Sequence, residues 1–377
     1  MEVHGDCDPK FTKVKEIFAD LYLQERELGS AFAIFKNGKP LVNIWAGYQD
    51  LNKTKKWQED TLVTVYSTTK GIAALCIALA VEKGLLDYQE RVEKYWPEFG
   101  CNGKEEITVS MLMSHQAGIC SPLTKNIDDY YNQESMAKKL ASMQPIWKPG
   151  TACGYHSMTY GWLVAELILR VTGKTIGTFF REEIGDRNDI DFFIGLPEAE
   201  EFRVAELESF EKILDNQNKN ADKKIELTVA QEALKESVNT IDHHNSREWR
   251  QAEIPAANGQ GSAAGLAKLY SLVTPEDLSL RILDERIVKE MTETQVEGKD
   301  LVLRVSLRWG NGFVLNKHKF VYGPVEKAFG HSGYGGSCAF SDPENKLGIS
   351  YVMNKMENNF AGDVRSIQLI NATYECM

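Results

Sequence analysis

The chain has 377 residues, enough for one large domain or two smaller ones, and its formal net charge at pH 7 is -11. This acidic balance argues against a nucleic-acid partner, because phosphate binding requires a basic surface, and it disfavours docking on anionic membranes. No apolar run approaches the roughly 20 residues that span a bilayer, and the N-terminus lacks the basic and apolar regions of a signal peptide, so we expect no membrane span and a cytoplasmic location.

The N-terminal segments predict a helix followed by a hairpin. Residues 11–28 place apolar side chains on one helical face. Residues 30–35 have strand character, Asn37-Gly38 is the strongest short hairpin signal, and residues 40–47 form the returning strand. The chain therefore begins with helix, strand, turn and strand.

The middle of the chain is mainly helical. Residues 71–83 and 158–172 each carry apolar side chains at helical spacing, and each segment is followed by a glycine that ends a helix. Residues 198–250 are charged, with helical periodicity in 202–214 and 227–238. We expect this charged stretch to be a surface excursion and not part of the core.

The C-terminal segments supply further strands, at residues 311–315, 336–341 and 347–353, and a closing helix at 363–374. Strands from both chain ends can form one antiparallel sheet, with the terminal helices covering one of its faces. The sequence thus predicts an α+β fold, in which a sheet of five or more strands from both ends is flanked by terminal helices and a mainly helical lobe is inserted.

The same pattern predicts a single catalytic domain over residues 1–377. Its sheet lobe would comprise about residues 10–60 and 300–377, and its helical lobe about residues 61–299. We find no internal repeat and no low-complexity tract that would suggest another organisation.

The chain contains three Ser-x-x-Lys matches: Ser67/Lys70, Ser135/Lys138 and Ser209/Lys212. The second and third lie among charged residues, where a solvated helical face explains them. Ser67 instead precedes the apolar helix at 71–83, where a helix N-cap is the structural alternative. If Ser67 and Lys70 form a catalytic motif, the Lys70 amine lies one helical turn from the Ser67 hydroxyl. Burial would lower the pKa of Lys70, and the neutral amine could then take the hydroxyl proton.

Tyr155-His156-Ser157 is a second candidate element, placed after a turn signal and just before the helix at 158–172. A tyrosine beside a lysine can act as a general base or pass protons to a leaving group. The alternative is a packed tyrosine with a hydrogen-bonded hydroxyl. Tyr130 begins a rival match, but no comparable turn precedes it.

His331-Ser332-Gly333 is the third element, just before the strand at 336–341. Its glycines leave the backbone open to close approach by a ligand, and an edge strand could supply a second oxyanion donor. The alternative is a glycine-rich β-turn. We expect Trp309 and Tyr334 to border the substrate.

Other polar residues predict no metal site and no cofactor. The seven cysteines form no CxxC pair, and their odd number indicates free thiols in a reducing compartment. No HExxH motif or Cys/His cluster has metal-ligand spacing. We expect His115 to be structural, and His243-His244 to lie in a charged loop.

The three elements in this order resemble the family of serine β-lactamases, penicillin-binding proteins and related esterases, specifically its class C β-lactamase-related branch. Residues 107–118, 258–267 and 329–337 are similar to further signatures of that branch. The resemblance implies that Ser67 is acylated and that Lys70 and Tyr155 handle its proton and activate the deacylating water. The oxyanion hole would use the backbone N–H of Ser67 and that of Tyr334.

Two departures from the family pattern bear on the substrate. His331 stands where many members have lysine, which removes a fixed positive charge for a substrate carboxylate. Ser157 stands where the β-lactamases usually have asparagine. Both changes disfavour β-lactam hydrolysis and leave ester or small amide and peptide substrates open.

The predicted function is therefore a serine hydrolase that forms an acyl-enzyme on a small-molecule ester or amide. Two alternatives are a catalytically silent scaffold or self-assembling protein, and a ligand-binding module that is acylated but barely turns over. The sequence leaves open the natural substrate, the oligomeric state and the choice between Lys70 and Tyr155 as the general base.

Overall fold

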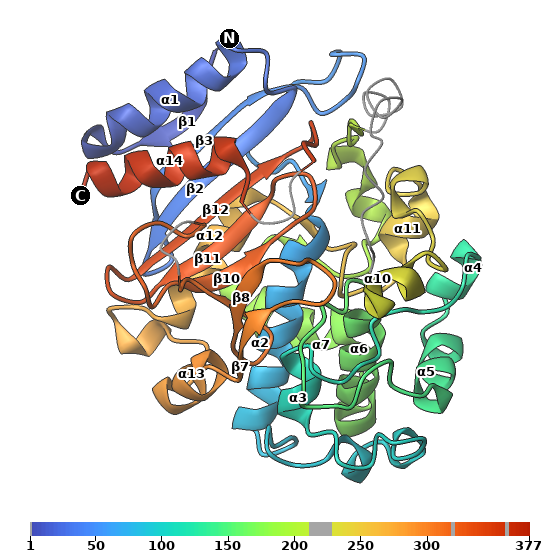
Figure 1. The fold of residues 1–377 in the computed structure, drawn as a ribbon. Coiled ribbons are helices and arrows are strands. Elements are labelled where there is room, and N and C mark those ends of the chain that lie inside the picture. Colours follow the sequence, from blue (N-terminus) through green and yellow to red (C-terminus); the bar gives the residue numbers. More distant parts are fainter. Residues whose placement is uncertain (1, 211–227, 318–320, 359–361) are drawn as a thin grey trace.

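The computed structural model describes residues 2–210, 228–317, 321–358 and 362–377. Its main sheet is antiparallel and nine-stranded, in the order β1-β3-β2-β12-β11-β10-β9-β8-β7 (Figure 1). Its strands are β1 (His4–Cys7), β2 (Gly29–Lys36), β3 (Lys39–Gly47), β7 (Val296–Lys299), β8 (Ser306–Trp309), β9 (Val314–Leu315), β10 (Phe329–Ser332), β11 (Cys338–Asp342) and β12 (Leu347–Met353). A second sheet, β4-β6-β5, joins β4 (Val63–Thr64), β5 (Phe192–Phe193) and β6 (Gln260–Gly261).

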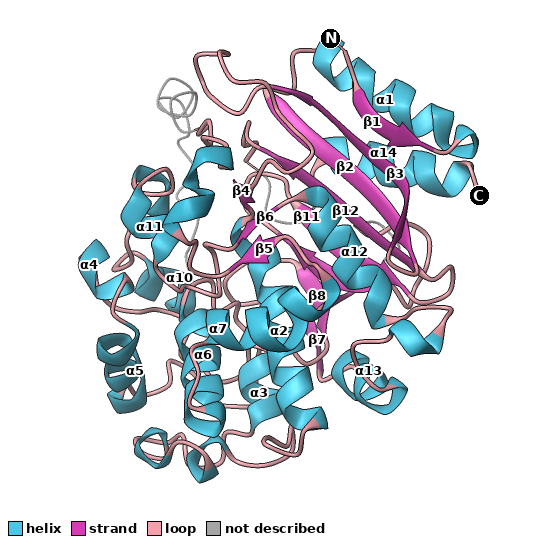
Figure 2. Ribbon diagram, turned by 180° about the vertical axis from the view of Figure 1, so that it is seen from behind, coloured by secondary structure: helices cyan, strands magenta, loops and turns pink. Residues whose placement is uncertain are grey.

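The helices divide between the sheet and a separate helical region (Figures 1 and 2). They are α1 (Thr12–Leu23), α2 (Thr69–Glu82), α3 (Val109–Met113), α4 (Ile127–Tyr130), α5 (Gln133–Ser142), α6 (Thr159–Thr172), α7 (Ile176–Phe180), α8 (Asp186–Asn188), α10 (Val229–Leu234), α11 (Arg247–Gln251), α12 (Ala263–Val273), α13 (Glu285–Thr292) and α14 (Val364–Glu375). None of the helices in the described ranges is long and apolar enough to cross a bilayer.

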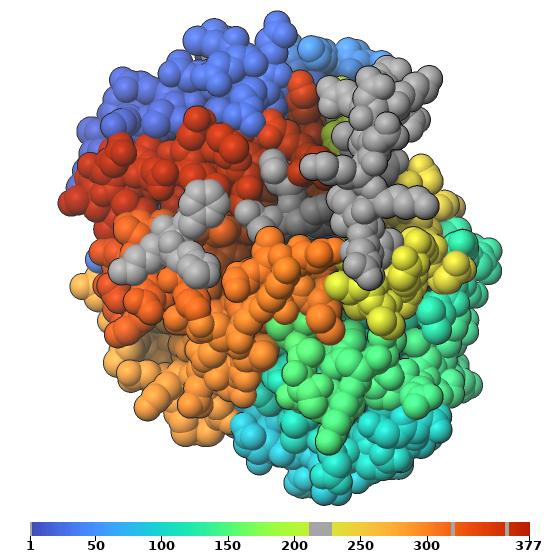
Figure 3. All heavy atoms as spheres, in the orientation of Figure 1, coloured from blue at the N-terminus to red at the C-terminus, as the bar shows by residue number. Residues whose placement is uncertain are grey.

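The sheet joins the two ends of the chain, as predicted. β12 pairs antiparallel with β2 along its whole length, so the N-terminal hairpin and the C-terminal strands form one sheet. Asn37 and Gly38 have φ angles of 52° and 70°, the positive values that a tight hairpin turn between β2 and β3 requires. Figure 3 shows the blue and red chain ends forming one continuous body beside the green and yellow segments.

Side chains alternate between the two faces of the sheet along each strand, so apolar residues on both faces can pack against helices. Phe32 and Ile34 on β2 pack in the core shared with α1 and α14, which confirms that the terminal helices cover one face. Ala31 and Ala33 face the other way and pack in the core that includes α12. Figure 2 shows α12 on that second face, whose cover the sequence analysis did not identify.

The helix after the first motif, α2, is buried on every side. Its predicted bounds of 71–83 become Thr69–Glu82, and Gly84, with φ 69°, follows it as expected. Gly71 is needed because a Cβ there would lie 2.0 Å from the Tyr270 hydroxyl. This central helix fixes the position of Lys70 in the core.

Several predicted bounds are corrected. The helix at 11–28 ends at Leu23, the strand at 311–315 shrinks to β9, and the strand at 336–341 begins only at Cys338. The helix predicted at 202–214 is wrong where it is described: a 3-10 turn ends at Arg203 and extended chain follows, while residues 211–214 lie outside the described ranges. Local periodicity failed there because tertiary contacts override weak helical preference.

The charged stretch at 198–250 is more than a surface excursion. Leu207, Ile241 and Trp249 are buried, and the predicted helix at 227–238 is confirmed in part as α10. Arg250 and Arg247 pair with Glu201, at 2.6 and 2.8 Å, so many of its charges neutralise one another within the stretch. This arrangement lets apolar side chains of the stretch face inward, toward the site described next.

Candidate active site

Ser67 lies in a 3-10 turn, Tyr66–Thr68, between β4 and α2. Thr68, and not Ser67, is the N-cap residue of α2, and it makes no side-chain capping bond, so the N-cap alternative for Ser67 is wrong. Tyr66 has φ 45°, an uncommon value for a non-glycine residue that is found at turns and at functional sites. Ser67 is therefore held by an unusual backbone conformation at the start of a buried helix.

Lys70 is fully buried, and its Nζ has three oxygen partners: Ser67 Oγ at 3.0 Å, the Ser157 carbonyl at 2.7 Å and the Ala256 carbonyl at 2.8 Å. Burial lowers the pKa of Lys70 well below its ordinary value. A neutral amine has two N–H donors and one lone pair. The two carbonyls match the two donors, which leaves the lone pair for the Ser67 hydroxyl proton.

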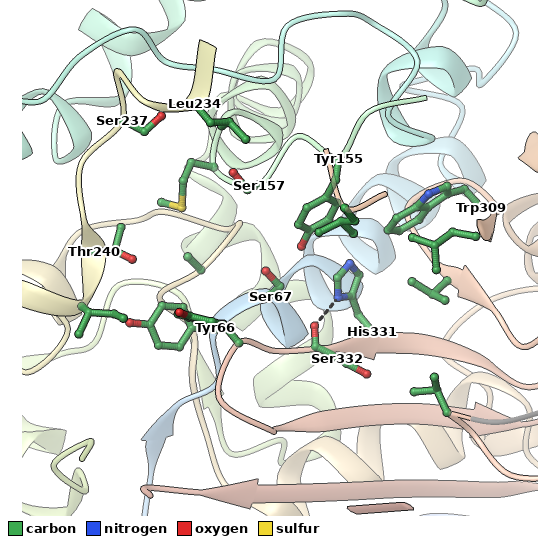
Figure 4. A pocket seen from close by; sticks show the side chains of 18 of the residues that line it. Tyr66, Ser67, Tyr155, Ser157, Leu234, Ser237, Thr240, Trp309, His331 and Ser332 are labelled. Carbon is green, nitrogen blue, oxygen red and sulfur yellow. Dashed lines mark hydrogen bonds between the residues drawn. The ribbon is translucent and has the colours of Figure 1, made fainter. Parts of the chain in front are cut away.

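The Tyr155 side chain lies close to Ser67 and Lys70. Lys70 Nζ lies 4.8 Å from the centre of its ring, and Tyr155 lines the same cavity as Ser67. Burial raises the pKa of Tyr155, the Asp300 carboxylate raises it further, and the neighbouring Ser67 hydroxyl opposes them. Figure 4 shows the Tyr155 and Ser67 hydroxyls facing each other. Tyr155 is thus a neutral phenol at neutral pH, suited to passing protons.

His331 on β10 is also neutral. Burial, followed by the nearby Lys70 amine in its protonated form, lowers the pKa of His331 to about 3, against the opposing effect of the Ser332 carbonyl. Its Nδ1 donates to that carbonyl at 2.8 Å, so Nε2 carries no proton. The His331 ring stacks on Tyr155 with centroids 6.1 Å apart. His331 therefore brings no positive charge to the site.

The glycines after His331 serve packing within the protein. A Cβ at Gly333 would lie 2.1 Å from the Val65 carbonyl oxygen and 2.2 Å from Ser337 Oγ, so the chain itself makes the close approach that was expected of a ligand. The following Tyr334 ring meets Tyr66 edge to face at 5.6 Å. This packing fixes the third motif against the strand that leads to Ser67.

One cavity of about 320 Å³ unites these elements (Figure 4). Six of the eight predicted site residues line it: Ser67, Tyr155, Ser157, His331, Ser332 and Tyr334. Lys70 contacts Ser67 without lining the cavity, and Gly333 does not line it either. Trp309 lines the cavity as predicted, beside Leu303 and Leu307. Among the described residues that line it, none is Asp, Glu, Lys or Arg.

The opposite wall was missed by the sequence analysis. It consists of Leu234, Val238, Ile241 and their neighbours from the charged stretch. Tyr130, the rival motif tyrosine, has a structural role there, since its hydroxyl accepts a hydrogen bond from Val238 N at 3.1 Å. The only signal in the sequence was the helical periodicity of 227–238, which gives no information about which surface the helix meets.

Two histidines for which the sequence predicted no catalytic role, His115 and His244, are buried near the cavity. His115 is structural as predicted, with Nδ1 accepting from His156 N at 3.2 Å. His244 lies in a turn, as expected, but it is buried and hydrogen-bonded through Nδ1 to the Tyr66 hydroxyl at 2.9 Å. This bond ties the cavity wall to the residue before Ser67.

The rival Ser-x-x-Lys matches are not assembled in this way. Ser135 lies on the exposed side of α5, where Lys138 pairs with Glu134 at 2.5 Å. Lys212, the partner of Ser209, lies outside the described residues. Within the described ranges, no group of His, Cys, Asp and Glu could hold a metal ion.

We expect the buried histidines to make the stability of the protein fall in acid. Burial lowers the pKa of His156 and His244 to about 4, that of His331 to about 3, and that of His115 well below its ordinary value. Between these values and about 6.5 the unfolded chain binds more protons, so the free energy of unfolding falls as the pH drops, by about 1.4 kcal/mol per pH unit for each histidine. Glu27, whose pKa burial raises to about 7, acts in the opposite sense and offsets about one histidine.

Urea unfolding at pH 7.0, 6.0 and 5.0 measures this slope. We expect a steep loss of stability between pH 6 and pH 5, and a shallower slope in His244→Gln. A stability that does not change over this range would contradict neutral burial of the histidines.

Comparison with known proteins identifies relatives of this chain. A 33% identical relative, the esterase/beta-lactamase LipL of Mycobacterium tuberculosis (strain ATCC 25618 / H37Rv), aligns over 377 residues, 94% of this chain and 83% of its own. A crystal structure of a family VIII carboxylesterase matches with 39% identity and a TM-score of 0.91, covering 100% of both chains. A penicillin-binding protein homologue from Caulobacter crescentus matches with 38% identity and a TM-score of 0.90, also over 100% of both chains.

The profile of the beta-lactamase family matches residues 14–373, nearly the whole chain. The resemblance inferred from the three motifs is thereby confirmed. The chain belongs to the beta-lactamase family, and it is a serine hydrolase of that family.

Proposed function

We propose that the protein hydrolyses neutral carboxylic esters through an acyl-enzyme on Ser67, with Lys70 as the general base and Tyr155 as the proton relay. The observation that carries this proposal is the position of Lys70 Nζ, 3.0 Å from Ser67 Oγ and in contact with two backbone carbonyls; in the neutral amine these carbonyls would take up both N–H donors and leave the lone pair for the Ser67 proton. A serine hydroxyl needs such a neighbouring base to become a nucleophile.

In the first half-reaction, Lys70 takes the Ser67 proton as Oγ forms a bond to the ester carbonyl carbon. The ester C–O bond then breaks, and the leaving alkoxide takes a proton from the Tyr155 hydroxyl, which regains one from the Lys70 ammonium. In the second half-reaction, water attacks the acyl carbonyl carbon and gives a proton to Lys70. The bond between Ser67 Oγ and the acyl carbon then breaks, Oγ takes the proton from Lys70, and the carboxylic acid leaves. The net reaction consumes one ester and one water and yields one acid and one alcohol.

The start of α2 supports stabilisation of the oxyanion. Backbone N–H groups at the first turn of a helix point toward a ligand, and the positive end of the helix dipole favours developing negative charge. Ser67 N lies in the 3-10 turn that leads directly into α2. A second donor at the Tyr334 backbone stays a prediction from the family resemblance.

The names of the relatives favour esters over amides. The relative from Mycobacterium tuberculosis and the family VIII structure are both described as esterases, and the latter shares 39% of its residues with this chain. Small-molecule substrates follow from the same names. The arrangement of Ser67, Lys70 and Tyr155 argues against a silent scaffold, which needs none of these contacts. Seven free thiols support a reducing location such as the cytoplasm.

The lining of the cavity supports neutral substrates. Its described side chains include no cation, and His331, which replaces the lysine of many family members, is neutral. A carboxylate bound there would lose its water shell without gaining a charged partner. Leu234, Leu303 and Leu307 instead offer apolar contact to an acyl or alcohol group.

A pair of esters of similar length tests this proposal. We expect kcat/KM for p-nitrophenyl pentanoate to exceed that for p-nitrophenyl hemisuccinate by about 100-fold, equivalent to about 3 kcal/mol for an unpaired charge. Mass spectrometry after rapid acid quenching should find the pentanoyl group on the peptide that contains Ser67. Absence of hydrolysis and of any adduct would favour the scaffold, and a persistent adduct without turnover would favour the ligand-binding module.

A further inference from the structure

Asp300 is a buried carboxylate next to the proposed proton relay. It follows β7 in a turn, is 1% exposed, and has no place in any of the three motifs. Its Oδ1 accepts hydrogen bonds from three backbone N–H groups: Tyr155 at 3.1 Å, Val302 at 2.8 Å and Leu303 at 2.8 Å. One oxygen atom thus ties the backbone of Tyr155 to a turn that lines the cavity.

The turn and the Tyr155 segment meet at a second point. Leu301 N donates to the Cys153 carbonyl at 2.9 Å, so the two segments lie side by side over several residues. On its other side, the turn is held by α10 and its N-cap. Thr228 Oγ1 donates to the Leu301 carbonyl at 2.6 Å, and Gln231 Nε2 donates to the Val302 carbonyl at 2.9 Å.

Tyr155 lies in a segment without helix or strand, between the turn at 147–150 and α6. A residue in such a segment has no ladder of backbone hydrogen bonds to hold it. The bond from Tyr155 N to Asp300 therefore fixes the residue whose hydroxyl must reach Ser67. Hydrogen bonds to a carboxylate are roughly twice as strong as neutral ones, which suits this task.

We propose that Asp300 is a positioning residue for the hydrolysis: its Oδ1 holds the Tyr155 backbone, and through it the relay hydroxyl, in register with Ser67 while anchoring the Leu303 turn. This inference rests on the proposed function, because it needs Tyr155 to move protons. Asp300 does not touch the reacting atoms, so it is not itself a catalytic residue.

Two substitutions separate position from charge. Asp300→Asn keeps an acceptor oxygen in the same place and removes the charge, whereas Asp300→Glu keeps the charge and displaces the carboxylate by one methylene, about 1.5 Å. We expect kcat for p-nitrophenyl pentanoate to stay within about fivefold of the unsubstituted protein in the first variant. In the second it should fall by about 10- to 100-fold, since misplacement of about 1 Å near the chemistry has effects of this size.

Combination with Tyr155→Phe distinguishes positioning from a general structural role. If Asp300 acts through Tyr155, Asp300→Glu should lower kcat little further once the Tyr155 hydroxyl is absent. Asp342→Glu is the matched control, because Asp342 is a buried carboxylate whose Oδ1 accepts from Glu344 N and Asn345 N in a turn of the main sheet. It should leave kcat unchanged.

Three results would overturn the inference: a kcat of Asp300→Glu within twofold of the unsubstituted protein, effects of Asp300→Glu and Tyr155→Phe that multiply, or an equal loss in Asp342→Glu. Should Asp300→Glu fail to fold, a loss of more than 10-fold in folded Asp300→Asn overturns it as well. An unsubstituted protein that neither hydrolyses esters nor forms an adduct would instead refute the proposed function.

Discussion

Ser67→Ala should lower kcat/KM for p-nitrophenyl pentanoate by at least about 10⁴-fold and abolish labelling by a fluorophosphonate probe. The substitution removes the only atom to which the acyl group becomes bonded in the proposed mechanism, and loss of a serine nucleophile has effects of this order. The Ser67 hydroxyl contacts Lys70 Nζ and occupies little volume, so we expect the thermal unfolding midpoint to change by only a few degrees.

Ser135→Ala is the matched control for this experiment. Ser135 begins a second Ser-x-x-Lys match, but it lies on the exposed side of α5, and its lysine pairs with Glu134. The variant should keep both hydrolysis and labelling. Probe attached to the Ser67→Ala protein at another serine, together with retained hydrolysis, would show that the nucleophile has been assigned to the wrong motif.

Replacement of Lys70 should have the second largest effect. Lys70→Met removes the amine but keeps an unbranched chain, and we expect kcat to fall by about 10²- to 10⁴-fold, the usual contribution of a general base. Lys70→Arg keeps a cation that stays protonated at all accessible pH values. If the neutral amine is the base, both variants lose activity. An arginine variant with nearly full activity would show that the charge matters and that proton transfer occurs elsewhere.

The pH dependence of kcat/KM tests the role of Lys70 independently. Burial lowers the pKa of Lys70, and only the deprotonated amine can accept the Ser67 proton, so kcat/KM should rise with pH through that pKa, at values well below 10.5. The rising limb should be absent from the residual activity of Lys70→Met. Lys138→Met, in the rival motif on α5, should retain both the activity and the limb.

The sequence by itself determined much of the fold, because the signals involved are local. Asn37-Gly38 predicted the hairpin through the turn geometry these residues favour, and the apolar spacing after Lys70 predicted α2. The order of the three motifs identified the family and named Ser67 and Tyr155. These features depend on residues a few positions apart, so a single chain segment is sufficient to specify each of them.

Only the tertiary structure decided how the candidate site is arranged. The Lys70 amine is held by the carbonyls of Ser157 and Ala256, which are 87 and 186 residues away along the chain. Asp300 reaches Tyr155 across 145 residues, and His331 is neutral because of burial. Backbone carbonyls carry no signature in the sequence, and the pKa of a side chain depends on the solvent and charges around it. These properties arise when distant segments pack together, and local sequence patterns do not encode them.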